Sequence, residues 1–130
     1  MFVRRDLALF WLWWCVGMGL VVTVCVQSLS SSPIESPGFE YGDKLGHFLV
    51  YFCLMSWFVQ LYQRASHVLL FVLFVALGIL LEVLQGQTAY RMFEYADMLA
   101  NSAGACLAWV LAKTCYSQLI EALEQRFLGS

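Results

Sequence analysis

Four long apolar segments alternate with polar stretches along the chain. They run from about 7 to 26, 44 to 62, 67 to 85 and 94 to 115. Twenty helical residues rise about 30 Å, roughly the thickness of the hydrocarbon layer of a bilayer. Each segment therefore predicts a membrane-spanning helix. A cleaved signal peptide at the first segment is disfavoured, because its apolar run is long and no small-residue cleavage site follows it.

The polar stretches predict how these helices are connected. Residues 27–42 are rich in serine and contain both prolines of the chain, which predicts one long loop. The short stretch 63–66 predicts an antiparallel hairpin between its neighbours, and 86–93 predicts a turn.

The tail 116–130 has a different pattern, typical of an amphipathic helix on the membrane surface or against a partner. One predicted face carries the apolar residues Leu119, Ile120, Leu123 and Phe127. The polar residues Glu121, Glu124, Gln125 and Arg126 are predicted to point away from that face.

Composition supports a membrane protein. The 130 residues are 62% hydrophobic and 12% charged, too few charges to cover the surface of a soluble domain. We therefore predict an all-α fold with a single domain over 1–130, a four-helix transmembrane bundle with a C-terminal amphipathic interfacial helix. The cysteines lie in apolar runs as small hydrophobic residues, and no cofactor is expected.

Charge predicts the orientation and excludes one class of partner. The seven basic residues are scattered, which argues against a nucleic-acid partner. If both termini are cytoplasmic, Lys44 and Arg91 are the two basic residues on the outer side, and the other five lie on or near the inside. The excess of inner positive charge favours this orientation.

Polar residues interrupt three of the predicted helices at one membrane level. Antiparallel connections would bring them together on the outer side: Asp43, Lys44, His47 and Tyr51; Glu82 and Gln85; Arg91, Glu94, Asp97 and Asn101. Residues four apart on a helix are offset by only about 40°, so each set occupies one face.

A charged residue at the centre of a spanning helix costs roughly 2.5 to 3.5 kcal/mol, so these faces should point toward each other. We interpret them as an outer-side ligand-binding pocket, and the alternative is polar pairing that only fixes helix packing. Catalytic candidates are His47, Glu82 and Asp97. Proton or hydrogen-bond chemistry is favoured at His47, and no metal is expected because ligand spacing such as H-x-x-x-H is missing.

Three of these motifs together resemble a known family. D-K-x-x-H-x-x-x-Y begins at Asp43, E-x-x-Q begins at Glu82, and R-x-x-E-x-x-D-x-x-x-N-x-x-G begins at Arg91. The set is similar to the VanZ-like family of small bacterial membrane proteins. Ala108 stands where a further glycine is common in that family. The resemblance implies a multi-pass protein of the bacterial inner (cytoplasmic) membrane, associated with the cell envelope. The family's founding member is linked to resistance to the glycopeptide teicoplanin.

Four functions follow as hypotheses. The first is a site for a lipid or lipid-linked head group, in which Lys44 and Arg91 would receive a phosphate. The second is an intramembrane acid/base enzyme acting on a lipid-linked substrate, although no nucleophile motif is present. The third is a proton-coupled transporter, which would need to form an oligomer. The fourth is an accessory helix bundle with a purely structural polar cluster.

Overall fold

The structure, a computed structural model, describes residues 1–4, 7–30, 42–89, 92–114 and 118–128. These ranges contain five α-helices: α1 (Phe10–Leu29), α2 (Gly42–Leu61), α3 (His67–Gln85), α4 (Tyr95–Leu111) and α5 (Leu119–Leu128). A short 3-10 turn, Arg64–Ser66, precedes α3. The described ranges hold no strand, so the all-α prediction is confirmed for them.

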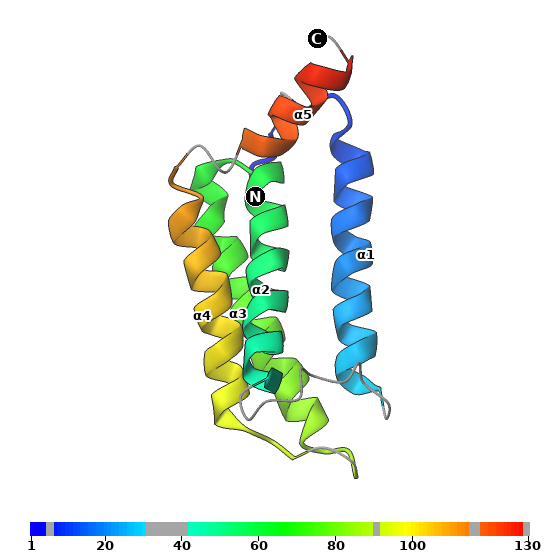
Figure 1. Ribbon diagram of the computed structural model, residues 1–130, viewed down its shortest axis with the longest axis vertical. Helices are drawn as coiled ribbons and strands as arrows, with labels where there is room; N and C mark the ends of the chain where they lie inside the picture. Colours follow the sequence, from blue (N-terminus) through cyan, green and yellow to red (C-terminus); the bar gives the residue numbers. More distant parts are fainter. Residues whose placement is uncertain (5–6, 31–41, 90–91, 115–117, 129–130) are drawn as a thin grey trace.

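The helices form an elongated bundle with α5 across one end (Figure 1). α2, α3 and α4 stand together, and α1 runs along one side of this group. We call the end that carries α5 and the α2–α3 connection the terminal end. The opposite end, where α2 and α4 begin and α3 stops, is the cluster end.

α2 and α4 approach each other closely because small residues of α4 face α2. Ala105, Ala108 and Ala112 are fully buried. A Cβ added at Gly104 would collide with the carbonyl oxygen of Phe48. Ala108, where a glycine is common in the family that the sequence resembles, is fully buried in this packing.

Three helical segments are long and apolar enough to cross a membrane: Phe10–Leu29, Gly42–Leu61 and Arg64–Gln85. Their outer faces expose large apolar side chains such as Trp11 and Val68, which suit contact with lipid tails. α4 is shorter at 17 residues. The structure thus identifies three candidate spans where the sequence predicts four.

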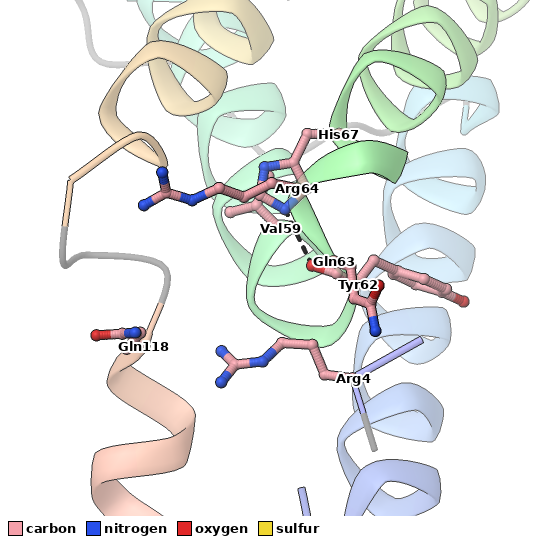
Figure 2. Close-up of a pocket in the computed structure, with 7 residues that line it drawn as sticks. All are labelled: Arg4, Val59, Tyr62, Gln63, Arg64, His67 and Gln118. Carbon is pink, nitrogen blue, oxygen red and sulfur yellow. Dashed lines mark hydrogen bonds between the residues drawn. The ribbon is translucent and has the colours of Figure 1, made fainter. Parts of the chain in front are cut away.

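At the terminal end, the start of the chain lies against the α2–α3 connection. Val3 and Tyr62 form an isolated antiparallel bridge, and the Phe2 amide donates a hydrogen bond of 2.7 Å to Ser66 Oγ. His67 Nε2 lies 3.0 Å from the Tyr62 carbonyl oxygen, as Figure 2 shows. Because a carbonyl can only accept, Nε2 carries the proton of this ring. These bonds fix the connection between the two helices.

The predicted amphipathic helix is present as α5, but one of its polar residues points the other way. Glu124 is buried rather than turned away from the bundle. Its carboxylate accepts hydrogen bonds from the Ala8 amide (2.7 Å), the Leu9 amide (3.0 Å) and Trp13 Nε1 (2.6 Å). The first amides of a helix have no partner within that helix and attract negative charge. Glu124 binds the two amides just before α1, where the positive end of the helix favours a carboxylate.

Candidate functional site

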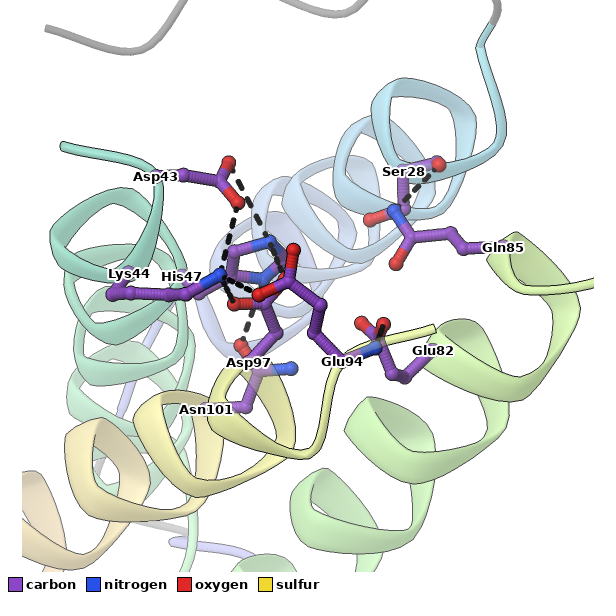
Figure 3. A network of polar contacts seen from close by, with 9 residues as sticks. All are labelled: Ser28, Asp43, Lys44, His47, Glu82, Gln85, Glu94, Asp97 and Asn101. Atoms are coloured by element: carbon purple, nitrogen blue, oxygen red, sulfur yellow. Dashed lines mark hydrogen bonds and ion pairs between the residues drawn. The ribbon is translucent and has the colours of Figure 1, made fainter. Parts of the chain in front are cut away.

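The polar residues of three helices meet at the cluster end (Figure 3). α2 contributes its first turns, α3 its last turn and α4 its first turns, as the predicted antiparallel connections require. We call Asp43, Lys44, His47, Glu94, Asp97 and Asn101 the polar cluster.

Lys44 lies at the centre of the polar cluster. Its Nζ is 2.5 Å from Glu94 Oε2, 2.6 Å from Asp97 Oδ1 and 3.7 Å from Asp43 Oδ2. One ammonium group therefore connects the starts of α2 and α4. Because three carboxylates surround this one ammonium, the described residues of this part of the site carry more negative than positive charge.

The three carboxylates around Lys44 differ in how exposed they are to solvent. The side chains of Asp43 and Glu94 are 43% and 48% exposed, whereas that of Asp97 is 3% exposed. A buried carboxylate is costly unless it is paired, and the contact with Lys44 supplies that pairing. The cluster thus has an accessible rim and a buried base.

His47 lies between the rim and the base. Its Nε2 is 3.6 Å from Asp97 Oδ2 and 3.9 Å from Asp43 Oδ1, and its Nδ1 is 3.2 Å from Asn101 Oδ1. Both ring nitrogens therefore face oxygen atoms. An imidazole oriented by a buried carboxylate is an arrangement that can accept and release protons.

Tyr51 lies one helical turn beyond His47 on α2. Its side chain is buried, and its hydroxyl has no hydrogen-bond partner among the described residues. Gly78 of α3 leaves room for this packing, because a Cβ there would lie 3.3 Å from Tyr51 Cε1 and 3.2 Å from Asn101 Cβ. Tyr51 is therefore near the predicted site but has no polar contact with the polar cluster in the described structure.

Glu82 and Gln85 of α3 form hydrogen bonds with backbone groups beside the polar cluster. Glu82 is buried, and its Oε1 accepts a hydrogen bond of 2.8 Å from the amide of Glu94, the residue before α4. Gln85 is also buried, and its Nε2 donates to the Ser28 carbonyl oxygen of α1 at 2.7 Å. Both side chains bind the ends of neighbouring helices.

These two contacts were not predictable from the pattern of polar residues. Each has a backbone group as its partner, so no side-chain motif marks it, and Ser28 was not a candidate. The remaining predicted residue, Arg91, lies outside the described residues.

Three side chains of the polar cluster could together hold a metal ion. Asp43, His47 and Asp97 each offer a ligand atom, and these atoms lie within 4.8 Å of one another. Lys44 contacts both carboxylates of this set and would compete with a cation for them. The expectation of no metal remains a prediction.

Comparison with known proteins gives one match. The family model described as VanZ/LLP1 matches residues 7–116. This range includes α1 to α4 and every residue of the polar cluster. No curated protein and no solved structure matches the chain.

Proposed function

Because the chain belongs to the VanZ/LLP1 family, we propose that its polar cluster binds the polar head group of a lipid or of a lipid-linked component of the bacterial cell envelope. In this proposal α4 is the fourth span. Its 17 residues rise about 26 Å, a little less than the hydrocarbon layer. Both termini are cytoplasmic, and the polar cluster faces the outer side of the inner membrane.

The observation that carries this proposal is the surplus of carboxylates at an accessible rim. Asp43 and Glu94 remain half-exposed although Lys44 contacts both. A network that served packing alone would not need two carboxylates exposed at its edge. A head group that offers hydrogen-bond donors, such as hydroxyl or amine groups, would complete it.

The negative charge of the rim also determines which part of a head group can bind there. A phosphate approaching Lys44 would have to displace Glu94 or Asp97, which already lie within 2.6 Å of the ammonium. The surrounding carboxylates would repel the phosphate as well. The donor groups of the ligand, rather than its phosphate, are therefore the part that the polar cluster is suited to bind.

Lipids that copurify with the protein test this proposal. The full chain would be isolated from bacterial membranes in mild detergent, and its lipids identified by mass spectrometry. We expect one donor-bearing lipid class to be retained by the wild type and lost from a double variant, Asp43→Asn with Glu94→Gln. Gln87→Ala, a change at an exposed residue of the same end, serves as the matched control and should retain the lipid.

Both variants must remain folded for this comparison. Their melting temperatures should stay near that of the wild type, because the altered side chains lie at the rim and not in the core. Identical lipid profiles for the wild type and the folded double variant would rule out the proposal. A link to glycopeptide resistance is part of it only if the retained lipid carries a cell-wall precursor.

The contact between His47 and Asp97 favours a second candidate, an acid/base enzyme that acts on a lipid-linked substrate. In that case Asp97 would orient His47, and Glu82 would be a further acid or base. Wild-type protein incubated with a bacterial lipid extract should then consume one lipid species and release another. Turnover that persists in a His47→Ala and Asp97→Asn double variant would exclude these roles.

A further inference from the structure

The terminal end contains a polar cavity that the proposed function does not use. It has a volume of about 160 Å³ and is shown in Figure 2. At roughly 30 Å³ per water molecule, this space holds about five waters, enough for a phosphate group. Its lining comes from the start of the chain, the end of α2, the α2–α3 connection and the residue before α5.

The lining of this cavity is cationic. Arg4 and Arg64 contribute two guanidinium groups, and the described residues that line it include no carboxylate. Gln63 and Gln118 add side-chain amides that can donate hydrogen bonds. A planar guanidinium beside amide donors suits the several acceptor oxygens of a phosphate.

Contacts within the protein hold both arginines at the cavity. The Arg4 amide donates to the Leu61 carbonyl oxygen at 3.1 Å, and its guanidinium forms an ion pair with Glu121. Arg64 donates one hydrogen bond of 3.1 Å to the Lys113 carbonyl oxygen. A guanidinium has five N–H donors, so this bond leaves donors of Arg64 for a ligand.

An apolar groove shares one lining residue with this cavity. It has a volume of about 240 Å³ and lies between α1, α2 and α3, with Trp14, Met18, Phe74 and Leu77 among its lining. Tyr62 lines both the groove and the cavity. Its hydroxyl accepts a hydrogen bond of 3.1 Å from Trp14 Nε1, which fixes the position of the Tyr62 side chain.

From this juxtaposition we propose that the terminal end binds an anionic phospholipid. The phosphate occupies the cavity against the remaining donors of Arg64, since the Arg4 guanidinium is paired with Glu121. One acyl chain lies in the groove that shares Tyr62 with the cavity. The exposed apolar side chains of α5, Leu123 and Phe127, hold this end at the membrane boundary, where such head groups are found. Free phosphate shares the head-group chemistry but has no part that fits the groove.

Native mass spectrometry of the full chain in mild detergent tests this proposal. The protein would be titrated with dioleoylphosphatidylglycerol and with dioleoylphosphatidylcholine, which differ in net charge but have the same acyl chains. We expect the wild type to prefer the anionic lipid by roughly fivefold or more. Millimolar inorganic phosphate should leave the bound phosphatidylglycerol in place.

Two variants at the terminal end distinguish direct contact with the lipid phosphate from a general effect of positive charge. Arg64→Gln and Lys113→Gln each remove one positive charge, but the Lys113 side chain lies over Trp109 rather than at the cavity. Arg64→Gln should bind phosphatidylglycerol about tenfold more weakly than Lys113→Gln. Arg64→Lys, which keeps the charge, should recover part of the loss.

Three results would overturn this proposal. One is equal affinity of the wild type for the two lipids, and another is equal behaviour of folded Arg64→Gln and Lys113→Gln variants. The third is displacement of the lipid by inorganic phosphate, which would indicate a phosphate site with no role for the groove. The folded Asp43→Asn and Glu94→Gln double variant, which tests the proposed function, should keep the preference for the anionic lipid, so the two proposals can fail independently.

Discussion

At the scale of single residues, Lys44 explains how a buried carboxylate is tolerated at the cluster end. Asp97 is almost fully buried, and its closest charged partner is the Lys44 ammonium. An unpaired carboxylate at this depth would cost several kcal/mol. Lys44 therefore has a structural role whether or not the polar cluster binds a ligand.

Replacing Lys44 with methionine tests this role and the competition with metal ions. We expect Lys44→Met to destabilise the protein by about 1 to 3 kcal/mol, because Asp97 loses its counter-charge. Mn²⁺ should then raise the melting temperature of the variant, since the Lys44 ammonium no longer competes with a cation for the carboxylates of Asp43 and Asp97. It should leave the wild type unchanged.

The control for this experiment is Lys113→Met, which removes an exposed lysine at the other end of the bundle. Its melting temperature should stay near that of the wild type with or without Mn²⁺. Equal stabilisation of the wild type by Mn²⁺ would show that the native site binds metal, contrary to the sequence-based prediction.

At the scale of helices, the contact between α2 and α4 determines the geometry of the polar cluster. Lys44 and His47 reach Asp97 and Asn101 only because the two helices lie close together along their length. At Gly104 the two helices are so close that an added Cβ would collide with the backbone of α2 at Phe48. Backbone atoms cannot move aside as the end of a flexible side chain can.

A Gly104→Ala variant should therefore be destabilised by about 1 to 3 kcal/mol, although alanine is the better helix former. Gly46→Ala is the matched control, because a Cβ at Gly46 has no atom within 4 Å. That change should be neutral or stabilise the protein by up to about 1 kcal/mol. Thermal unfolding in detergent measures both; equal effects would contradict the close contact.

Helix positions were largely predictable from the sequence. The predicted segment 67–85 coincides with α3, and 44–62 lies within two residues of α2. The first helix begins three residues later than predicted, at Phe10. Apolar composition continues through residues 7–9, but the Ala8 and Leu9 amides bond to Glu124. A partner more than a hundred residues away leaves no trace in the local pattern.

The candidate site was predictable only in part, for a related reason. Helical phase correctly brought Asp43, Lys44 and His47 to the side that faces α4, because charged groups avoid lipid. It also directed Glu82 and Gln85 toward the same centre, whereas they bind the helix ends beside it. Periodicity identifies the face on which a residue lies but not the backbone group that it reaches.

At the scale of the whole molecule, the two ends of the bundle differ in charge. The polar cluster is rich in carboxylates, whereas the cavity at the terminal end is lined by arginines. Positive charge favours the cytoplasmic side of a bacterial membrane. This asymmetry agrees with the proposed orientation.

Cysteine labelling in intact cells tests that orientation. In a background without native cysteines, Ala89→Cys would mark the cluster end and Gln125→Cys the terminal end; both residues are exposed. A membrane-impermeant maleimide should label Ala89→Cys directly and Gln125→Cys only after the inner membrane is permeabilised. The opposite pattern would invert the topology and place the polar cluster inside.

The hydrogen bonds at the two ends of α1 have a consequence for how the protein is made. Gln85 binds the last turn of α1, and Glu124 binds the amides at its start. During synthesis Glu124 leaves the ribosome more than a hundred residues after Ala8 and Leu9. These two amides therefore wait for more than a hundred further residues before their carboxylate partner is available. A nascent chain that stops short of Glu124 would leave the Ala8 and Leu9 amides without this carboxylate partner.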